Sequence, residues 1–234
     1  MNVKKIITGL ALPMLLSSAV AVAADFDKGL KAAKSGDFKT ALAEWTPLAE
    51  QGDVEAQYNL GIMYDYGRGV PENDKTAVKW FTLAAEQGDA FAQHNLGNMY
   101  ANGKGVPEND KTAVKWLTKA AEQGYAKAQY NLSNMYARGD GVPENHKTAV
   151  SWLTKAVKQG HADAQGNLGV LYARGEGVLT DIKRAYMWSN LGAYNGNEMA
   201  GENKDIIAKN MTPADISKAQ DMSSACLESN YTDC

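Results

Sequence analysis

The sequence has little of what most enzymes use for catalysis. Its 234 residues include only three histidines, His94, His146 and His161, and these lie in different parts of the chain. It contains no HExxH motif, no glycine-rich phosphate loop after a strand and no nucleophile elbow. We therefore expect a protein that is not an enzyme, with no catalytic residue, no cofactor and no metal site.

Runs of basic residues are also missing. The chain has 24 Lys and Arg against 27 Asp and Glu, a formal net charge of −3 at pH 7. Domains that bind nucleic acid or anionic lipid usually show a basic run or patch. The sequence therefore predicts no nucleic-acid partner.

Cysteine is scarce, and both cysteines, Cys226 and Cys234, lie at the end of the chain. In an exported protein, two cysteines eight residues apart favour one disulfide that ties the chain end to the last helix. A metal pair or a redox switch is the alternative, but it would need closer spacing or a neighbouring ligand, and neither is visible.

Long apolar runs are absent except near the N-terminus. Lys4 and Lys5 precede an apolar stretch from Ile6 to about Leu16, and small residues follow up to Ala24. This order predicts a secretory signal peptide over residues 1–24, cleaved after Ala23 or Ala24. The rival is an uncleaved anchor, but the apolar stretch is short and Pro13 interrupts it. We expect a periplasmic or secreted protein with no stable membrane anchor after cleavage.

What the sequence has in abundance is repetition. The dipeptide Gln51-Gly52 returns at Gln87-Gly88, Gln123-Gly124 and Gln159-Gly160, and the text between these marks is nearly the same each time. A fixed period of 36 residues is typical of a solenoid. The period divides the chain into four repeats, residues 53–88, 89–124, 125–160 and 161–196.

Each repeat is predicted to be a helix hairpin. In the first copy Ala56, Leu60 and Tyr64 are four residues apart, so they share one stripe of a helix over 53–66. Two glycines and a proline in 67–71 then end that helix. A second helix follows with Asp74 as its expected N-cap. Hairpins with one apolar side bury it by stacking on their neighbours.

Other residues are expected to support the array. Tryptophan recurs as Trp80, Trp116, Trp152 and Trp188, in an arrangement that favours packing between hairpins over ligand stacking. Residues 25–52 are expected to form an N-terminal capping hairpin. Residues 197–234 are expected to form C-terminal capping helices, the last of them starting at Thr212-Pro213.

The repeated pattern A-x-x-x-L-G-x-x-Y-x-x-G-x-G-V, which begins at Ala56, resembles the Sel-one-like repeat, a relative of the tetratricopeptide repeat. The resemblance covers about residues 53–195. It implies an all-α fold, a right-handed α-solenoid of stacked helix hairpins. It also implies a scaffold or adaptor that holds a protein or peptide partner in its concave groove.

In tetratricopeptide-like stacks the first helix of each hairpin lines the concave side, so residues off its packing stripe are the binding candidates. By resemblance the partner-binding candidates are Tyr58, Ile62, Tyr66, Phe91, His94, Asn98, Asn102, Lys127, Tyr130, Asn134, Arg138 and Arg174.

Several interpretations stay open at this point. The recurring Asn59, Asn95, Asn131 and Asn167 favour a structural role within the repeat, whereas Asn98 and Asn134 suit a ligand-binding role equally well. The second function considered is an envelope enzyme that acts on cell-wall material or β-lactams. It would need a nucleophile and base that the sequence does not show.

Overall fold

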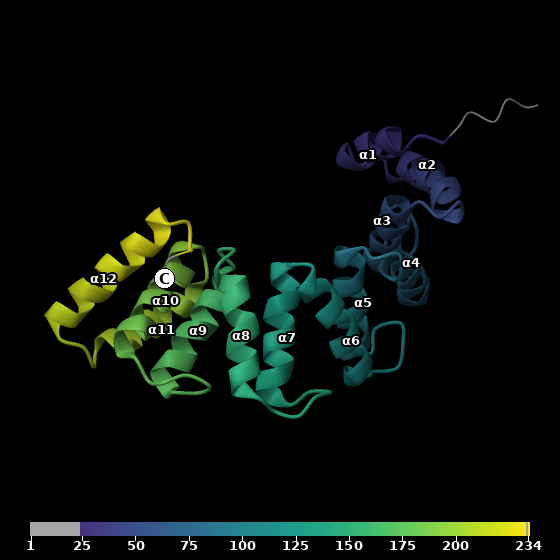
Figure 1. Ribbon diagram of the computed structural model, residues 1–234. Coiled ribbons are helices and arrows are strands. Elements are labelled where there is room, and N and C mark those ends of the chain that lie inside the picture. The colour runs from purple at the N-terminus through teal and green to yellow at the C-terminus, as the bar shows by residue number, and fades with distance from the viewer. Residues whose placement is uncertain (1–23, 233) are drawn as a thin grey trace, which may run out of the picture.

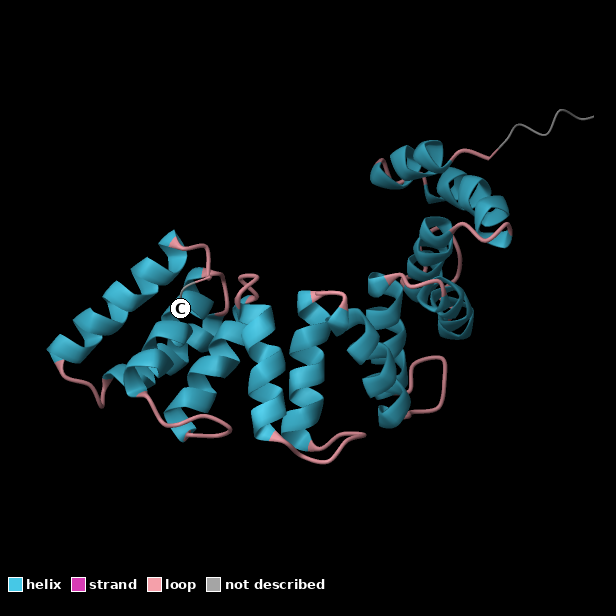
Figure 2. Ribbon diagram, viewed as in Figure 1, coloured by secondary structure: helices cyan, strands magenta, loops and turns pink. Residues whose placement is uncertain are grey.

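Every regular element in the described part of the chain is a helix (Figure 2). The structure is a computed structural model that describes residues 24–232 and 234. The helices are α1 Phe26–Lys34, α2 Phe38–Glu50, α3 Val54–Asp65, α4 Asp74–Glu86, α5 Ala90–Asn102, α6 Asp110–Glu122, α7 Ala126–Arg138, α8 His146–Val157, α9 Ala162–Arg174, α10 Ile182–Tyr194, α11 Glu198–Ala208 and α12 Pro213–Glu228.

The helices pair into hairpins, and each hairpin packs on the next. Within a repeat the first helix packs on the second, as α3 does on α4, and the second helix then packs on the first helix of the following repeat. The chain follows one arc from α1 to α12 (Figure 1). The predicted all-α solenoid is confirmed. The predicted signal peptide lies outside the described residues, except for Ala24.

The core is divided into clusters, roughly one for each junction between hairpins. Trp80 of α4 packs against the cluster that contains Trp45 and Leu60, and Trp116 packs against the next one along. Trp152 does the same one repeat later, and Trp188 is buried in the last large cluster. The recurring tryptophans thus join successive hairpins, as the sequence predicts.

The glutamine of each recurring Gln-Gly dipeptide has a structural role. Gln87, just after α4, donates from Nε2 to Oε1 of the buried Gln57 on α3 at 2.7 Å. Gln57 in turn donates to the carbonyl of Ala49 in the preceding hairpin at 3.0 Å. A buried amide is stable only when its polar atoms are bonded, so this chain of bonds fixes each repeat on its neighbour.

Two glycines of the repeat are needed because neighbours come close. A Cβ on Gly61 of α3 would lie 2.5 Å from the ring of Phe81 on α4. The glycine at position 61 therefore makes room for a side chain of the second helix. A Cβ on Gly105, in the loop after α5, would lie 2.5 Å from the backbone of Asp74 in the preceding repeat. The loop glycine therefore serves the contact between repeats as well as the turn.

The second helices begin one residue earlier than expected. Asn73, Asn109 and Asn145 are the N-caps of α4, α6 and α8, and each side chain accepts a bond from a threonine N–H. Asp74 is the first helical residue, so its assignment as the N-cap was wrong. His146 is likewise the first helical residue of α8 and follows the Asn145 cap.

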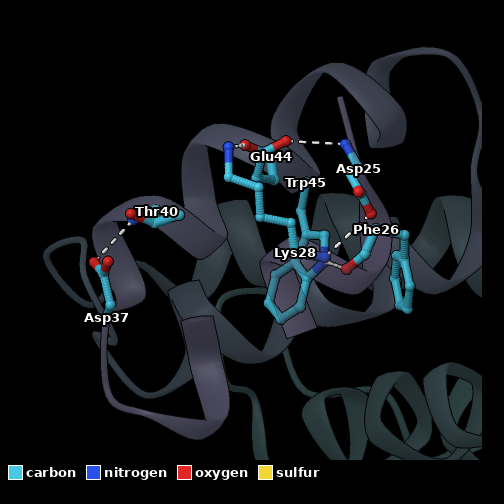
Figure 3. Close-up of polar contacts among 7 residues, drawn as sticks. All are labelled: Asp25, Phe26, Lys28, Asp37, Thr40, Glu44 and Trp45. Carbon is cyan, nitrogen blue, oxygen red and sulfur yellow. Dashed lines mark hydrogen bonds and ion pairs between the residues drawn. The ribbon is translucent and has the colours of Figure 1, made fainter. Parts of the chain in front are cut away.

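Polar contacts hold the two helices of the N-terminal hairpin together (Figure 3). Glu44 of α2 accepts bonds from the backbone N–H of Asp25, at 2.9 Å, and from the Lys28 ammonium. These donors hold the pKa of the Glu44 carboxyl below its usual value. Trp45 donates from Nε1 to the carbonyl of Phe26 at 3.2 Å, which fastens α1 on α2. Pro47 lies inside α2, and the helix continues past it to Glu50.

The last helix, α12, begins at Pro213 with Thr212 as its N-cap, as predicted. This helix packs on α10. Cys226 is buried in the cluster around Trp188, and it forms a disulfide with Cys234 across a Cα–Cα distance of 5.0 Å. The bond ties the chain end to the last helix, as the cysteine spacing predicts.

Reducing this disulfide is expected to lower the free energy of unfolding by about 2 kcal/mol, because it closes only a short loop. Urea unfolding with and without reductant measures the difference. The variant Cys234→Ala should unfold like the reduced protein and should not respond to reductant. No change in the wild-type midpoint on reduction would contradict the assignment.

Candidate binding surface

A hollow recurs at each junction between successive hairpins, always beside the first helix. Each one is lined by a recurring asparagine and by the residue three positions later, at the same place in every repeat. The hollows have volumes of about 250, 200, 270 and 210 Å³ along the chain. The paired residues are Asn59 and Ile62, Asn95 and Asn98, Asn131 and Asn134, and Asn167 and Val170. We call this set of four hollows the first-helix row.

The recurring asparagines link successive first helices. Asn131 of α7 donates to Oδ1 of Asn98 on α5 at 2.8 Å, across a repeat boundary. One repeat later Asn167 donates to Oδ1 of Asn134 at a longer 3.4 Å. The structural role favoured from the sequence was a bond within the repeat, but these two asparagines bond to side chains of the preceding repeat.

Asn98 and Asn134 differ in how much of their amide is free. Asn98 also contacts Nε2 of His94 through Nδ2 at 3.1 Å, so both ends of its amide are engaged. The Nδ2 of Asn134 has no hydrogen-bond partner among the described residues, and Asn134 lines two neighbouring hollows. Asn134 is therefore the better placed of the two to bind a ligand.

The side chain of His94 is buried beside the first-helix row, although we expected it on the surface. Its side chain is only 8 % exposed, and burial lowers its pKa to about 4. Its Nε2 faces the Nδ2 donors of Asn98 and Asn131, at 3.1 and 3.2 Å, so this nitrogen is assigned as the acceptor. A neutral ring with its proton on Nδ1 fits these bonds and supports the link between repeats.

The other candidates fall into two groups. Tyr58, Ile62 and Tyr130 are half-buried and pack against core clusters. The remaining candidates outside the asparagine pairs are exposed, including Phe91 at 50 % and Tyr66 at 62 %. The exposed group is Tyr66, Phe91, Asn102, Lys127, Arg138 and Arg174.

Sequence reasoning missed the loop residue that ends each hollow. It lies between the two glycines of the Gly-x-Gly turn, and its charge changes sign along the row. These residues are Arg68, Lys104, Asp140 and Glu176. Their 36-residue spacing was the available signal, but the motif was interpreted only as turn chemistry.

Two of these four loop charges pair with oppositely charged helix residues. Lys104 lies 2.8 Å from a carboxylate oxygen of Asp65 and 3.2 Å from one of Asp74, and these partners raise the pKa of its ammonium. Arg174 lies 3.7 Å from Glu176. Acids and bases therefore lie next to one another at these two places in the row.

Among the described residues no group of three or more His, Cys, Asp or Glu side chains is placed to hold a metal ion. None of the described helices combines the length and hydrophobicity needed to cross a lipid bilayer. What the row presents to solvent is amides, paired charges and partly exposed rings. These are groups that bind by hydrogen bonding and packing.

The fold and the row define a class of protein, the helical repeat solenoid. The family model of the Sel1 repeat matches residues 54–89, 90–125, 126–161 and 162–197, and the chain belongs to this family. Sel1 repeats serve typically as scaffolds for protein interaction. This agrees with the resemblance drawn from the sequence.

Two solved structures are close to this chain. One is c5321, a protective antigen present in uropathogenic Escherichia coli strains that displays an SLR fold. It is 34% identical with a TM-score of 0.82, and the match covers 88% of this chain and 46% of the antigen. The other is a Sel1 repeat protein from Oxalobacter formigenes, with 36% identity, a TM-score of 0.70 and coverage of 75% and 72%. This chain thus spans about half the length of the antigen. No curated protein matches it significantly.

Proposed function

We propose that this protein is an exported scaffold that binds an extended segment of a partner protein along the first-helix row. The observation that carries the proposal is the recurrence of one hollow, with an amide at the same place, at all four junctions. An extended chain presents backbone groups and alternating side chains at regular intervals. A periodic row of polar hollows suits such a ligand better than it suits a compact small molecule.

The exposed members of the candidate set would make the contacts. Asn102 and Arg138 line one hollow, and Arg174 lines the next. Asn134, between them, has free donors for a backbone carbonyl. Tyr66 and Phe91 would bury apolar surface against partner side chains at the N-terminal end, since aromatic residues contribute strongly at interfaces.

The test is capture of a partner from an envelope fraction by the whole protein and by the variant Asn102→Ala, Arg138→Ala, Arg174→Ala. All three side chains are exposed, so the variant should fold normally. The matched control is Lys31→Ala, Lys39→Ala, Lys209→Ala, which changes exposed residues that line none of the four hollows. The proposal expects a partner that the first variant loses and the control retains. Equal capture by all three proteins would overturn it.

The second function, an enzyme that acts on cell-wall material or β-lactams, has no specific observation in its favour. The buried His94 is bonded to asparagines, and His161 stacks on Tyr130 with ring centroids 5.0 Å apart. Neither is paired with a nucleophilic hydroxyl or thiol among the described residues. The scaffold is therefore the function we propose.

Export is part of the same proposal, and it leads to a prediction about the mature N-terminus. The backbone N–H of Asp25 already donates to Glu44, beside Lys28. Cleavage after Ala24 would turn this N–H into an ammonium that pairs with the Glu44 carboxylate. Mass spectrometry of the protein from a periplasmic or culture fraction should therefore give a mature chain that starts at Asp25. A full-length chain that starts at Met1 would contradict export.

A further inference from the structure

Lysines that are scattered in the sequence gather on the outer sides of the second helices. The 36-residue period places them on matching turns of α4, α6 and α8, and neighbours four apart on one helix are separated by about 6 Å. All of them are exposed. We call this set the lysine ridge, and it consists of Lys75, Lys79, Lys111, Lys115, Lys119, Lys147, Lys155 and Lys158.

The ridge has no internal neutralisation. Acidic residues occur only at the first or last positions of α4 and α6, and α8 has none. No lysine of the ridge lies within ion-pair distance of a carboxylate in the described part of the chain, although several other lysines do. This positive surface belongs to a protein whose formal net charge is −3, so it reflects a local concentration of charge.

Four of these lysines lie over tryptophan rings, among them Lys115 at 5.9 Å from the ring centroid of Trp116. The Lys155 ammonium lies 3.9 Å from the ring centroid of Trp152, and Lys119 lies 4.6 Å from that of Trp116. Lys79 lies further from Trp80, at 5.8 Å. The indoles are themselves held in the contacts between hairpins. Cation–π contacts therefore hold these ammonium groups close to the fixed tryptophan rings even without a bound anion.

The fourth copy of the ridge position shows what such a lysine can bind. Lys183 on α10 lies 36 residues after Lys147, and its ammonium is 2.9 Å from the carboxylate of Asp215 on α12. The partner raises the pKa of Lys183. Where the chain itself brings a carboxylate to this position, an ion pair forms. The three earlier copies, Lys75, Lys111 and Lys147, have no such partner.

We propose that the lysine ridge binds a linear anionic polysaccharide, with its carboxylate, phosphate or sulfate groups paired to successive lysines. A membrane would need apolar side chains to insert, and the one large apolar side chain exposed on α4, α6 and α8 is Leu83, at 36 %. A protein interface usually has an exposed apolar or aromatic centre, whereas the indoles of Trp80, Trp116 and Trp152 are half-buried. Lysine, as a mobile point charge, suits a flexible polymer better than a planar bidentate contact. This surface is separate from the first-helix row, so the two proposals are independent.

The test measures binding of heparin oligosaccharides to the whole protein over a series of NaCl concentrations, with neutral dextran as the reference. The ridge variant is Lys115→Gln, Lys119→Gln, Lys155→Gln. The control is Lys31→Gln, Lys34→Gln, Lys39→Gln, which removes the same charge from exposed positions of the N-terminal hairpin. Circular dichroism confirms that both variants fold.

The wild-type protein should bind heparin and not dextran, with log K falling linearly as log salt rises. Each lost contact lowers that slope by somewhat less than one, so the ridge variant should show a slope shallower by about 2. Its affinity at low salt should fall at least about 10-fold, and that of the control by less than about twofold. Equal losses in both variants, or no preference over dextran, would overturn the proposal. Tighter binding of duplex DNA or of anionic vesicles through the same lysines would overturn the assignment to a polysaccharide.

Discussion

The variant Gly105→Ala is expected to lose about 3 kcal/mol or more of unfolding free energy. Gly105 has a φ of +73°, and a residue with a Cβ pays about 1–2 kcal/mol in that region. The new Cβ would also lie 2.5 Å from the backbone of Asp74 in the preceding repeat. Backbone atoms cannot relieve a clash by changing rotamer, as a side chain can. The two repeats must therefore separate locally, which lowers the unfolding free energy by a further 1–3 kcal/mol or so.

The control for this variant is Gly124→Ala. Gly124 also has a positive φ, +91°, but a Cβ there would meet nothing within 4 Å. It should lose only the backbone part, about 1–2 kcal/mol. Urea unfolding of both variants, followed by circular dichroism, gives the comparison. If both lost the same free energy, close approach of loop and helix would not be what requires glycine at position 105.

The variant His94→Tyr is expected to remove much of the protein's sensitivity to mild acid. Burial lowers the pKa of His94 from 6.5 to about 4. Between pH 6.5 and about pH 4, His94 is therefore protonated in the unfolded chain and neutral in the folded chain. Stability therefore falls as the pH drops from about 6.5 towards 4. For the pKa values given, the loss between pH 7 and pH 5 is about 2 kcal/mol.

Tyrosine is the matched replacement because Tyr58 and Tyr130 hold the equivalent position in the first and third repeats. The unfolding free energies of both proteins are measured by urea denaturation at pH 7 and pH 5. The difference between the two pH values should be smaller by about 2 kcal/mol in the variant. Burial also lowers the pKa of His161, but this residue titrates in both proteins and cancels in the comparison. An unchanged difference would show that His94 takes up its proton freely in the folded protein.

The fold could be predicted because its cause is periodic. The spacing of Ala56, Leu60 and Tyr64 defines a buried helical stripe, and repetition every 36 residues supplies the neighbours that cover it. The start of the last helix at Pro213, with Thr212 as its N-cap, followed from local capping chemistry. By contrast the caps of the second helices were misplaced by one residue. The sequence Asn73-Asp74 offers two good capping residues, and only the backbone geometry selects the first.

The candidate surface could be predicted only in part. Counting along one helix shows which side chains leave the packing stripe, and this located Asn102, Arg138 and Arg174 correctly as exposed. It could not show that His94 contacts the ring of Tyr125 and the amide of Asn131, because both contacts cross a repeat boundary. The contribution of Lys104 was missed for the same reason, since its carboxylate partners belong to the preceding repeat.

The most direct test of the scaffold proposal is photo-crosslinking in cells. A benzoylphenylalanine replaces Asn102 or Arg138 in the first-helix row, and in separate strains it replaces Ser151 or Lys155 on the second helices. Irradiation should join one discrete protein to the two row positions, through an extended segment that mass spectrometry can map. The two outer positions should not capture that protein. Adducts at the outer positions alone, or the same protein at all four, would contradict binding along the row.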